Sequence, residues 1–290
     1  AISVSAFNAA ATYRRVPFPI QLSGGSIALT EEKMDFSDLR CVVGKSEFLD
    51  VGGTLRWDPA PFLDVHSTRA EAAMDEVSPW LQSQPALSRL FTDVRDMKGV
   101  LLLNDLVLKG PLMTPGDWQL EMAGRMRDFS CEIEKVAERI GIREGEFSYL
   151  GGASRGRLSL GGARLLASDG ALQTTGTIDY DLTSGFDADL SLKGELGNAS
   201  MRKLARLVGL PPKYVPGSPL SIPIARFWRS TDGTTRVSGD ALLGGEVSVS
   251  LECLVTKKRV TINNLVVRDG QSFAQASLDW QDRTVALAFK

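Results

Sequence analysis

Hydrophobic and polar residues alternate with a period of two along most of the chain, which predicts antiparallel β-strands with one dry and one wet face. Two such runs flank a short turn at 183–185 and predict a hairpin between residues 172 and 192. The same alternation covers 247–255 and 278–289. The dry-face positions of these runs are the candidate residues for a binding surface: Leu172, Ile178, Tyr180, Leu182, Phe186, Leu190, Leu192, Val247, Val249, Leu251, Leu278 and Trp280.

Few segments have the spacing of an amphipathic helix. Residues Thr68–Glu71 match a capping box and predict a helix over 70–77, which the prolines that follow break into short pieces. Asn198 is a suitable N-cap for a second helix over 199–208. A third short helix is predicted over 133–140.

Similar segments recur along the chain. Residues 165–180 and 265–280 share a leucine, an Asp-Gly pair, an aliphatic residue, an aspartate and an aromatic ring at matching positions. Residues 36–46 match 262–272 in spacing. Repeated units are typical of quasi-one-dimensional architectures that work through an extended surface, here one long antiparallel sheet.

Composition and charge narrow the classes of function. The chain has 290 residues, of which 43% are hydrophobic and 23% charged, so we expect a folded protein with a sizeable core. The net charge is −2 with scattered basic residues, which does not support a nucleic-acid surface. The domain division that we predict is a β unit with a short helical segment over 1–98 and a β region over 99–290, with one continuous sheet over 1–290 as the alternative.

The cysteines and the chain ends bear on the compartment. Cys41, Cys131 and Cys253 are too few for a disulfide framework, although one disulfide stays open. No run of about 18 apolar residues is present that would span a membrane. The chain starts at Ala1 and ends on an alternating strand, so we expect a piece of a longer protein whose targeting segment lies outside it.

The polar residues do not form a recognisable catalytic or metal site. The single histidine, His66, lies on the wet side of a strand, and no clustered cysteines or histidines predict zinc. Aspartate pairs at 179 and 181 and at 187 and 189 have a spacing that a glycosidase could use, so a carbohydrate-active protein is one alternative. We expect a solvated face there, with no catalytic residue, no metal and no cofactor.

The dry face is the remaining candidate for function. Its simplest interpretation is ordinary core packing against a second layer. The other interpretation is an uncovered face, which soluble proteins rarely keep unless something binds there. Acyl chains suit such a face, because they need apolar area and no specific hydrogen bonds.

Several ordered segments resemble the AsmA-like family of Gram-negative envelope proteins, relatives of TamB in the bridge-like lipid-transfer group. They are Phe36–Ser46 followed by Gly52–Asp58, the paired-strand segment Asp117–Gly124, the helix at 199–208 with its Leu-Pro-Pro exit, and Asp269–Ser277. The resemblance covers most of the chain from about residue 24 onward.

The resemblance implies a long curved antiparallel sheet that forms an apolar groove, with 99–290 corresponding to the family's C-terminal region. It implies a periplasmic protein, tethered to the inner membrane by an anchor absent from this chain, that passes phospholipid towards the outer membrane. Envelope proteins at either end would be further partners, and the family has no catalytic residues to carry over. The alternative is a structural or assembly scaffold of the envelope, with the dry face closed into a core.

Overall fold

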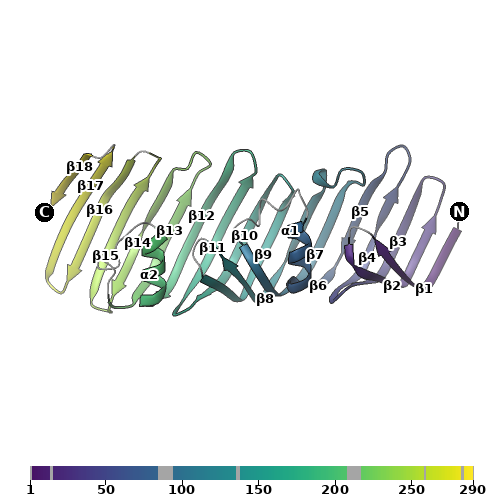
Figure 1. Cartoon of the computed structure of the whole chain (residues 1–290), viewed down its shortest axis with the longest axis horizontal. Coiled ribbons are helices and arrows are strands. Elements are labelled where there is room, and N and C mark those ends of the chain that lie inside the picture. Colours follow the sequence, from purple (N-terminus) through teal and green to yellow (C-terminus); the bar gives the residue numbers. More distant parts are fainter. Residues whose placement is uncertain are drawn as a thin grey trace. The chain divides into compact units, whose positions relative to one another are not determined.

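The computed structural model describes residues 2–13, 16–83, 94–134, 138–207, 217–257, 259–281 and 284–289. These residues form eighteen β-strands in one sheet, two α-helices and one short 3-10 helix (Figure 1). Antiparallel pairing joins most successive strands, and the two short strands at 62–67 and 69–73 each pair with both the strand at 46–56 and the strand at 94–111. The predicted mainly-β class with an antiparallel sheet and few helices is confirmed.

The chain divides into two units. Unit 1 comprises Ala1–Glu132 and Ile142–Leu158, and unit 2 comprises Ile133–Gly141 and Ser159–Lys290. Residue 98 lies inside a strand of unit 1, and the domain boundary that we expected there stays a prediction.

Unit 1 contains the first seven strands, most of the eighth and the first helix. Its elements are β1 (Ile2–Tyr13), β2 (Val16–Leu29), β3 (Lys33–Val43), β4 (Ser46–Arg56), β5 (Phe62–Ser67), β6 (Arg69–Ala73), α1 (Met74–Ser83), β7 (Val94–Pro111), the 3-10 helix (Pro115–Asp117) and most of β8 (Gln119–Ile133). Both units contain residues of β9 (Glu138–Gly152) and β10 (Arg155–Ala167).

Unit 2 continues as a series of hairpins with one helix inserted. Its further elements are β11 (Gly170–Asp181), β12 (Gly185–Leu196), α2 (Asn198–Leu207), β13 (Leu220–Arg229), β14 (Thr235–Leu243), β15 (Val247–Val255), β16 (Arg259–Asp269), β17 (Ser272–Gln281) and β18 (Thr284–Phe289).

The predicted hairpin at 172–192 is present as β11 and β12. Its register runs from Ala171 opposite Glu195 to Asp181 opposite Gly185. A carboxylate oxygen of Asp181 accepts the backbone N–H of Thr183 at 2.8 Å, a local bond that favours a turn after β11. Leu182 therefore lies in the turn and not on the paired strand where the alternation placed it.

The first helix begins later than predicted. Thr68 donates its hydroxyl to Asp50 at 2.7 Å, and Arg69–Ala73 form β6 in place of a helical turn. Ala70 and Ala72 pair with Leu103 and Leu101 of β7, so a long-range strand pairing overrides the local capping signal. Pro79 does not end α1 but lies inside it.

The other two helix predictions have different outcomes. The helix after Asn198 is confirmed as α2, and position 208 lies outside the described residues. The carboxylate of Asp169 accepts the N–H groups of Ala199 at 2.6 Å and Ser200 at 2.9 Å, so Asp169 caps α2 from the turn between β10 and β11. The helix predicted over 133–140 is wrong, because its described residues end β8 and begin β9.

The repeats are equivalent in structure only in part. The segments 36–46 and 262–272 each contain an irregular register, after Phe36 and after Ile262, and each ends in a two-residue turn. The turns start at Gly44 and Gly270, whose φ angles of +59° and +56° favour glycine. In 165–180 the turn comes earlier, at 168–169, so its Asp-Gly pair is not equivalent to the one at 269–270.

Candidate functional site

The strand register of unit 2 brings the sequence-predicted apolar residues onto one face of the sheet. Leu190 of β12 lies opposite Phe227 of β13, and Leu251 of β15 lies opposite Leu265 of β16. Directly opposed residues of an antiparallel pair project to the same face, and alternate residues of a strand share that face. We call this surface, which β11 to β17 share, the apolar face of unit 2.

Rows of apolar residues cross the strands on this face. One row joins six strands without interruption: Leu190, Phe227, Val237, Cys253, Ile262 and Leu278. A second row runs beside it: Leu192, Ala225, Gly239, Leu251, Leu265 and Ala276. Eleven of the twelve candidates lie on β11, β12, β15 and β17, and the twelfth, Leu182, follows β11 in the turn.

None of the twelve candidates is buried. Phe186 is 39% exposed and Trp280 is 44% exposed, and the other ten are half-buried. Buried apolar side chains are few among the described residues from 159 onward, namely Ala163, Ala188, Leu196 and Met201. A face closed by a second layer would bury large residues such as Leu190 and Leu251 in its middle.

The total accessible surface agrees with an uncovered face. The chain exposes 17677 Å². A compact monomer of 31.4 kDa would expose about 12,000 Å², and two separate compact proteins of half that mass about 14,600 Å² together. The chain therefore exposes more surface than compact proteins of its mass do.

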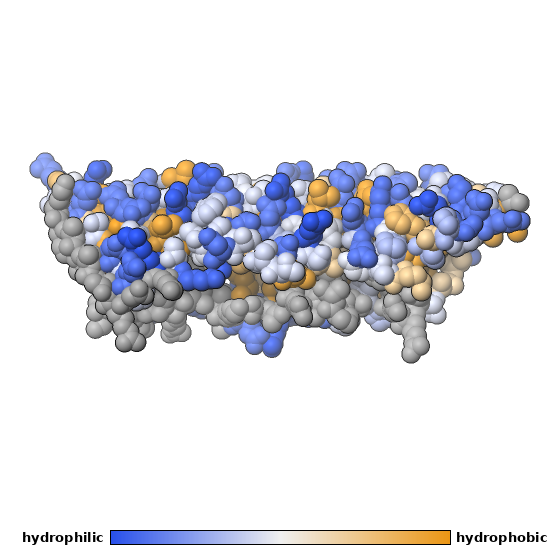
Figure 2. Space-filling view, turned by 90° about the horizontal axis from the view of Figure 1, so that it is seen from above, coloured by the Kyte–Doolittle hydropathy of each residue, from blue (hydrophilic) through white to orange (hydrophobic). Residues whose placement is uncertain are grey.

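The opposite face of unit 2 is polar. Arg226 donates two hydrogen bonds to the carboxylate of Asp189, at 2.9 Å from Nε to Oδ1 and 2.6 Å from Nη2 to Oδ2. These bonds hold the pKa of Asp189 below its ordinary value, so this carboxyl group stays ionised and does not suit a proton donor. Figure 2 shows the molecule from above the view of Figure 1. Hydrophilic residues cover much of the surface that is visible there, and hydrophobic residues lie between them.

The other polar candidates of the sequence are dispersed. Asp179 lies opposite Asp187, and Asp187 accepts the N–H of Thr231 at 2.7 Å. His66 is exposed on β5, as expected. No group of three or more metal-ligating side chains gathers within the described residues.

The cysteines are all free. Cys253 lies on the apolar face between Val237 and Ile262. Burial raises the pKa of the Cys41 and Cys253 thiols, so both behave as small hydrophobic groups.

Sequence reasoning missed part of the apolar face. Phe227 and Val237 complete the longest row, but they lie on β13 and β14, where bulges and charged neighbours obscure the alternation. The register around Pro223 is irregular, which is where a proline is tolerated within a strand.

Comparisons with known proteins give no relative for this chain. A scan against protein-family models, a search of curated proteins and a search of solved structures each found no match. Within the part of the chain that the structure describes, no helix is both long and apolar enough to cross a bilayer.

Proposed function

We propose that this chain is a lipid-binding segment whose apolar face holds acyl chains, as part of a periplasmic lipid-transfer conduit tethered to the inner membrane by an anchor outside this sequence. The observation that carries the proposal is the continuous row from Leu190 to Leu278, whose residues lie on one face and stay half-exposed. The sequence resemblance to AsmA-like proteins supports the cellular setting.

The dimensions of the row suit an acyl chain. Six adjacent strands at the usual spacing of about 4.8 Å place its first and last residues about 24 Å apart. One leaflet of a bilayer core is about 15 Å thick, so the row is longer than the depth that acyl chains fill in one leaflet. Each methylene of the acyl chain that leaves water contributes up to about 0.8 kcal/mol of binding free energy. A flat protein surface covers only one side of the acyl chain, so it gains part of that amount.

The two faces of unit 2 have complementary roles in this proposal. The polar face, with ion pairs such as Asp189 with Arg226, interacts with water and keeps the sheet soluble. The rows of the apolar face carry few hydrogen-bonding groups, which suits cargo that must slide along it. Arg229 reaches this face opposite Ala188, where its guanidinium lies over the Phe186 ring. The curved groove that the resemblance implies would extend this face and belongs to the same proposal.

The scaffold alternative expects the apolar face to be closed. The described strands form one sheet, and no second sheet among them closes the apolar face. The carbohydrate-active alternative rests on the aspartate pairs, and no observation on the apolar face favours it.

Native mass spectrometry tests the proposal with two matched variants. Leu190→Asp places a charge at the β12 end of the apolar row, whereas Ser191→Asp places the same charge on the polar face, close to Arg226. After incubation with phospholipid vesicles, we expect lipid adducts on the wild type and on Ser191→Asp and their loss from Leu190→Asp. Wild-type protein without adducts, or adducts that persist in Leu190→Asp, would refute the proposal.

A further inference from the structure

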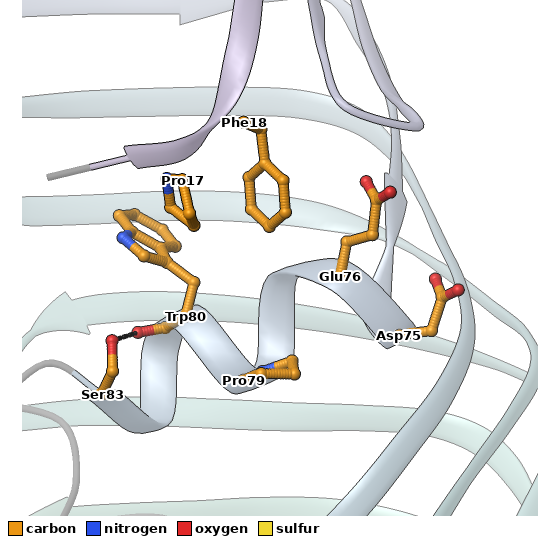
Figure 3. A pocket seen from close by; sticks show the side chains of 7 residues that line it. All are labelled: Pro17, Phe18, Asp75, Glu76, Pro79, Trp80 and Ser83. Atoms are coloured by element: carbon orange, nitrogen blue, oxygen red, sulfur yellow. Dashed lines mark hydrogen bonds between the residues drawn. The ribbon is translucent and has the colours of Figure 1, made fainter. Parts of the chain in front are cut away.

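A pocket in unit 1 lies between α1 and the start of β2. It has a volume of about 540 Å³ and is lined by Pro17, Phe18, Asp75, Glu76, Pro79, Trp80 and Ser83 (Figure 3). We propose that this pocket binds an alkylammonium group, such as a choline or a related quaternary amine. The proposal goes beyond the acyl-chain function, because it concerns other residues in the other unit.

The aromatic and carboxylate walls of the pocket face one another. In Figure 3 the Phe18 ring projects towards α1, with Trp80 beside Pro17 on one side and Glu76 on the other. A methyl group added to Gly44 would lie 2.3 Å from Oε2 of Glu76 and 3.4 Å from Cδ1 of Phe18. The Glu76 carboxylate and the Phe18 ring therefore both lie against the turn at Gly44.

Contacts with the β3–β4 turn fix the carboxylates in place. The backbone N–H of Lys45 donates to Oε2 of Glu76 at 2.7 Å, and Nζ of Lys45 lies 2.6 Å from Oδ2 of Asp75. The α1 helix is itself anchored by the buried residues Met74 and Ser78. The pocket thus has one wall on a packed helix and another on a strand and its turn.

The charges at the pocket leave room for a cation. Two carboxylates, Asp75 and Glu76, share one lysine, which gives a net charge of −1 around Lys45. The Lys45 ammonium lies 2.6 Å from Asp75 but 3.9 Å from the nearest Glu76 oxygen, so Glu76 is the less neutralised carboxylate. It is also the one beside the Phe18 ring.

Aromatic rings and a carboxylate together recognise alkylated amines. The negative faces of Trp and Phe rings attract the diffuse charge of a quaternary ammonium, and its methyl groups fill the apolar space. The volume lies in the range of small-molecule sites and exceeds the needs of a bare metal ion. A hard divalent cation would need six or more oxygen ligands, and two carboxylates do not provide them.

Titration calorimetry with tetramethylammonium tests this site directly. We expect saturable binding that Trp80→Leu weakens at least tenfold and that Glu76→Gln weakens severalfold. Trp228→Leu removes an exposed tryptophan of unit 2 and serves as the matched control, with unchanged affinity. Circular dichroism checks folding, and Phe18→Leu replaces Trp80→Leu if the latter unfolds.

The results separate this site from the acyl-chain face. Tetramethylammonium has no acyl chain, so its binding does not depend on the apolar face of unit 2. Free choline and glycerophosphocholine then distinguish a soluble amine from a lipid headgroup, according to which binds more tightly. No saturable binding by the wild type, or equal affinity in all the pocket variants, would overturn the proposal.

Discussion

Truncating two leucines of the apolar face provides a direct measure of how far that face is covered. Leu196 and Leu251 both belong to unit 2, but Leu196 is 6% exposed whereas Leu251 is half-buried. Leu196 lies opposite Leu220, and Leu251 lies between Gly239 and Leu265. The pair therefore compares the same substitution, leucine to alanine, in two environments of one sheet face.

The expected losses of stability differ by a factor of two or more. A buried Leu→Ala change loses the transfer free energy and leaves a cavity, for about 3 kcal/mol. At Leu251 only part of the side chain leaves water on folding and solvent fills the space, so the loss is about 1 kcal/mol.

Urea unfolding followed by circular dichroism measures both losses against the wild type. If Leu251→Ala costs as much as Leu196→Ala, at about 3 kcal/mol, the face around Leu251 is a closed core. The reasoning that leads to an open lipid-binding surface would then be wrong.

Two further predictions concern the polar face and the β3–β4 turn. Hydrogen bonds from Arg226 depress the pKa of Asp189, so this pair contributes stability that is present above about pH 4 and is lost as the pH falls further. When Tm is plotted against pH, the decrease of Tm on the acid side should therefore be shallower for Asp189→Asn than for the wild type. Gly44→Ala should lower the free energy of unfolding in urea by about 1–2 kcal/mol, because Gly44 has a φ of +59° and the new methyl group would displace Glu76. Gly116→Ala is the control and should lower it less, because the space around the Cβ position of Gly116 is open.

Local signals predicted the strands well and their ends less well. The hairpin of β11 and β12 follows from alternation over neighbouring residues, and the register confirms it apart from Leu182 in its turn. The start of α1 was mispredicted because Ala70 and Ala72 fit both a helix and a strand, and their pairing with β7, a segment distant in sequence, decides between them.

The candidate surfaces depend on information that one strand does not contain. Alternation identifies a dry face for each strand, but only the pairing register shows that Leu190, Phe227 and Cys253 form one row. The pocket of unit 1 has no sequence signature, because Phe18 and Trp80 are far apart along the chain and meet through the path of β2 and α1.

Two tryptophans on opposite faces of unit 2 test the central claim most directly. Trp280 lies opposite Val260 on the apolar face and is 44% exposed, and Trp228 lies opposite Asp189 on the polar face and is 38% exposed. Brominated fatty acid should quench the tryptophan fluorescence of the wild type. Most of that quenching should disappear in Trp280→Phe and persist in Trp228→Phe. Quenching that is absent, or that is equal in the two variants, would contradict an acyl-chain-binding face.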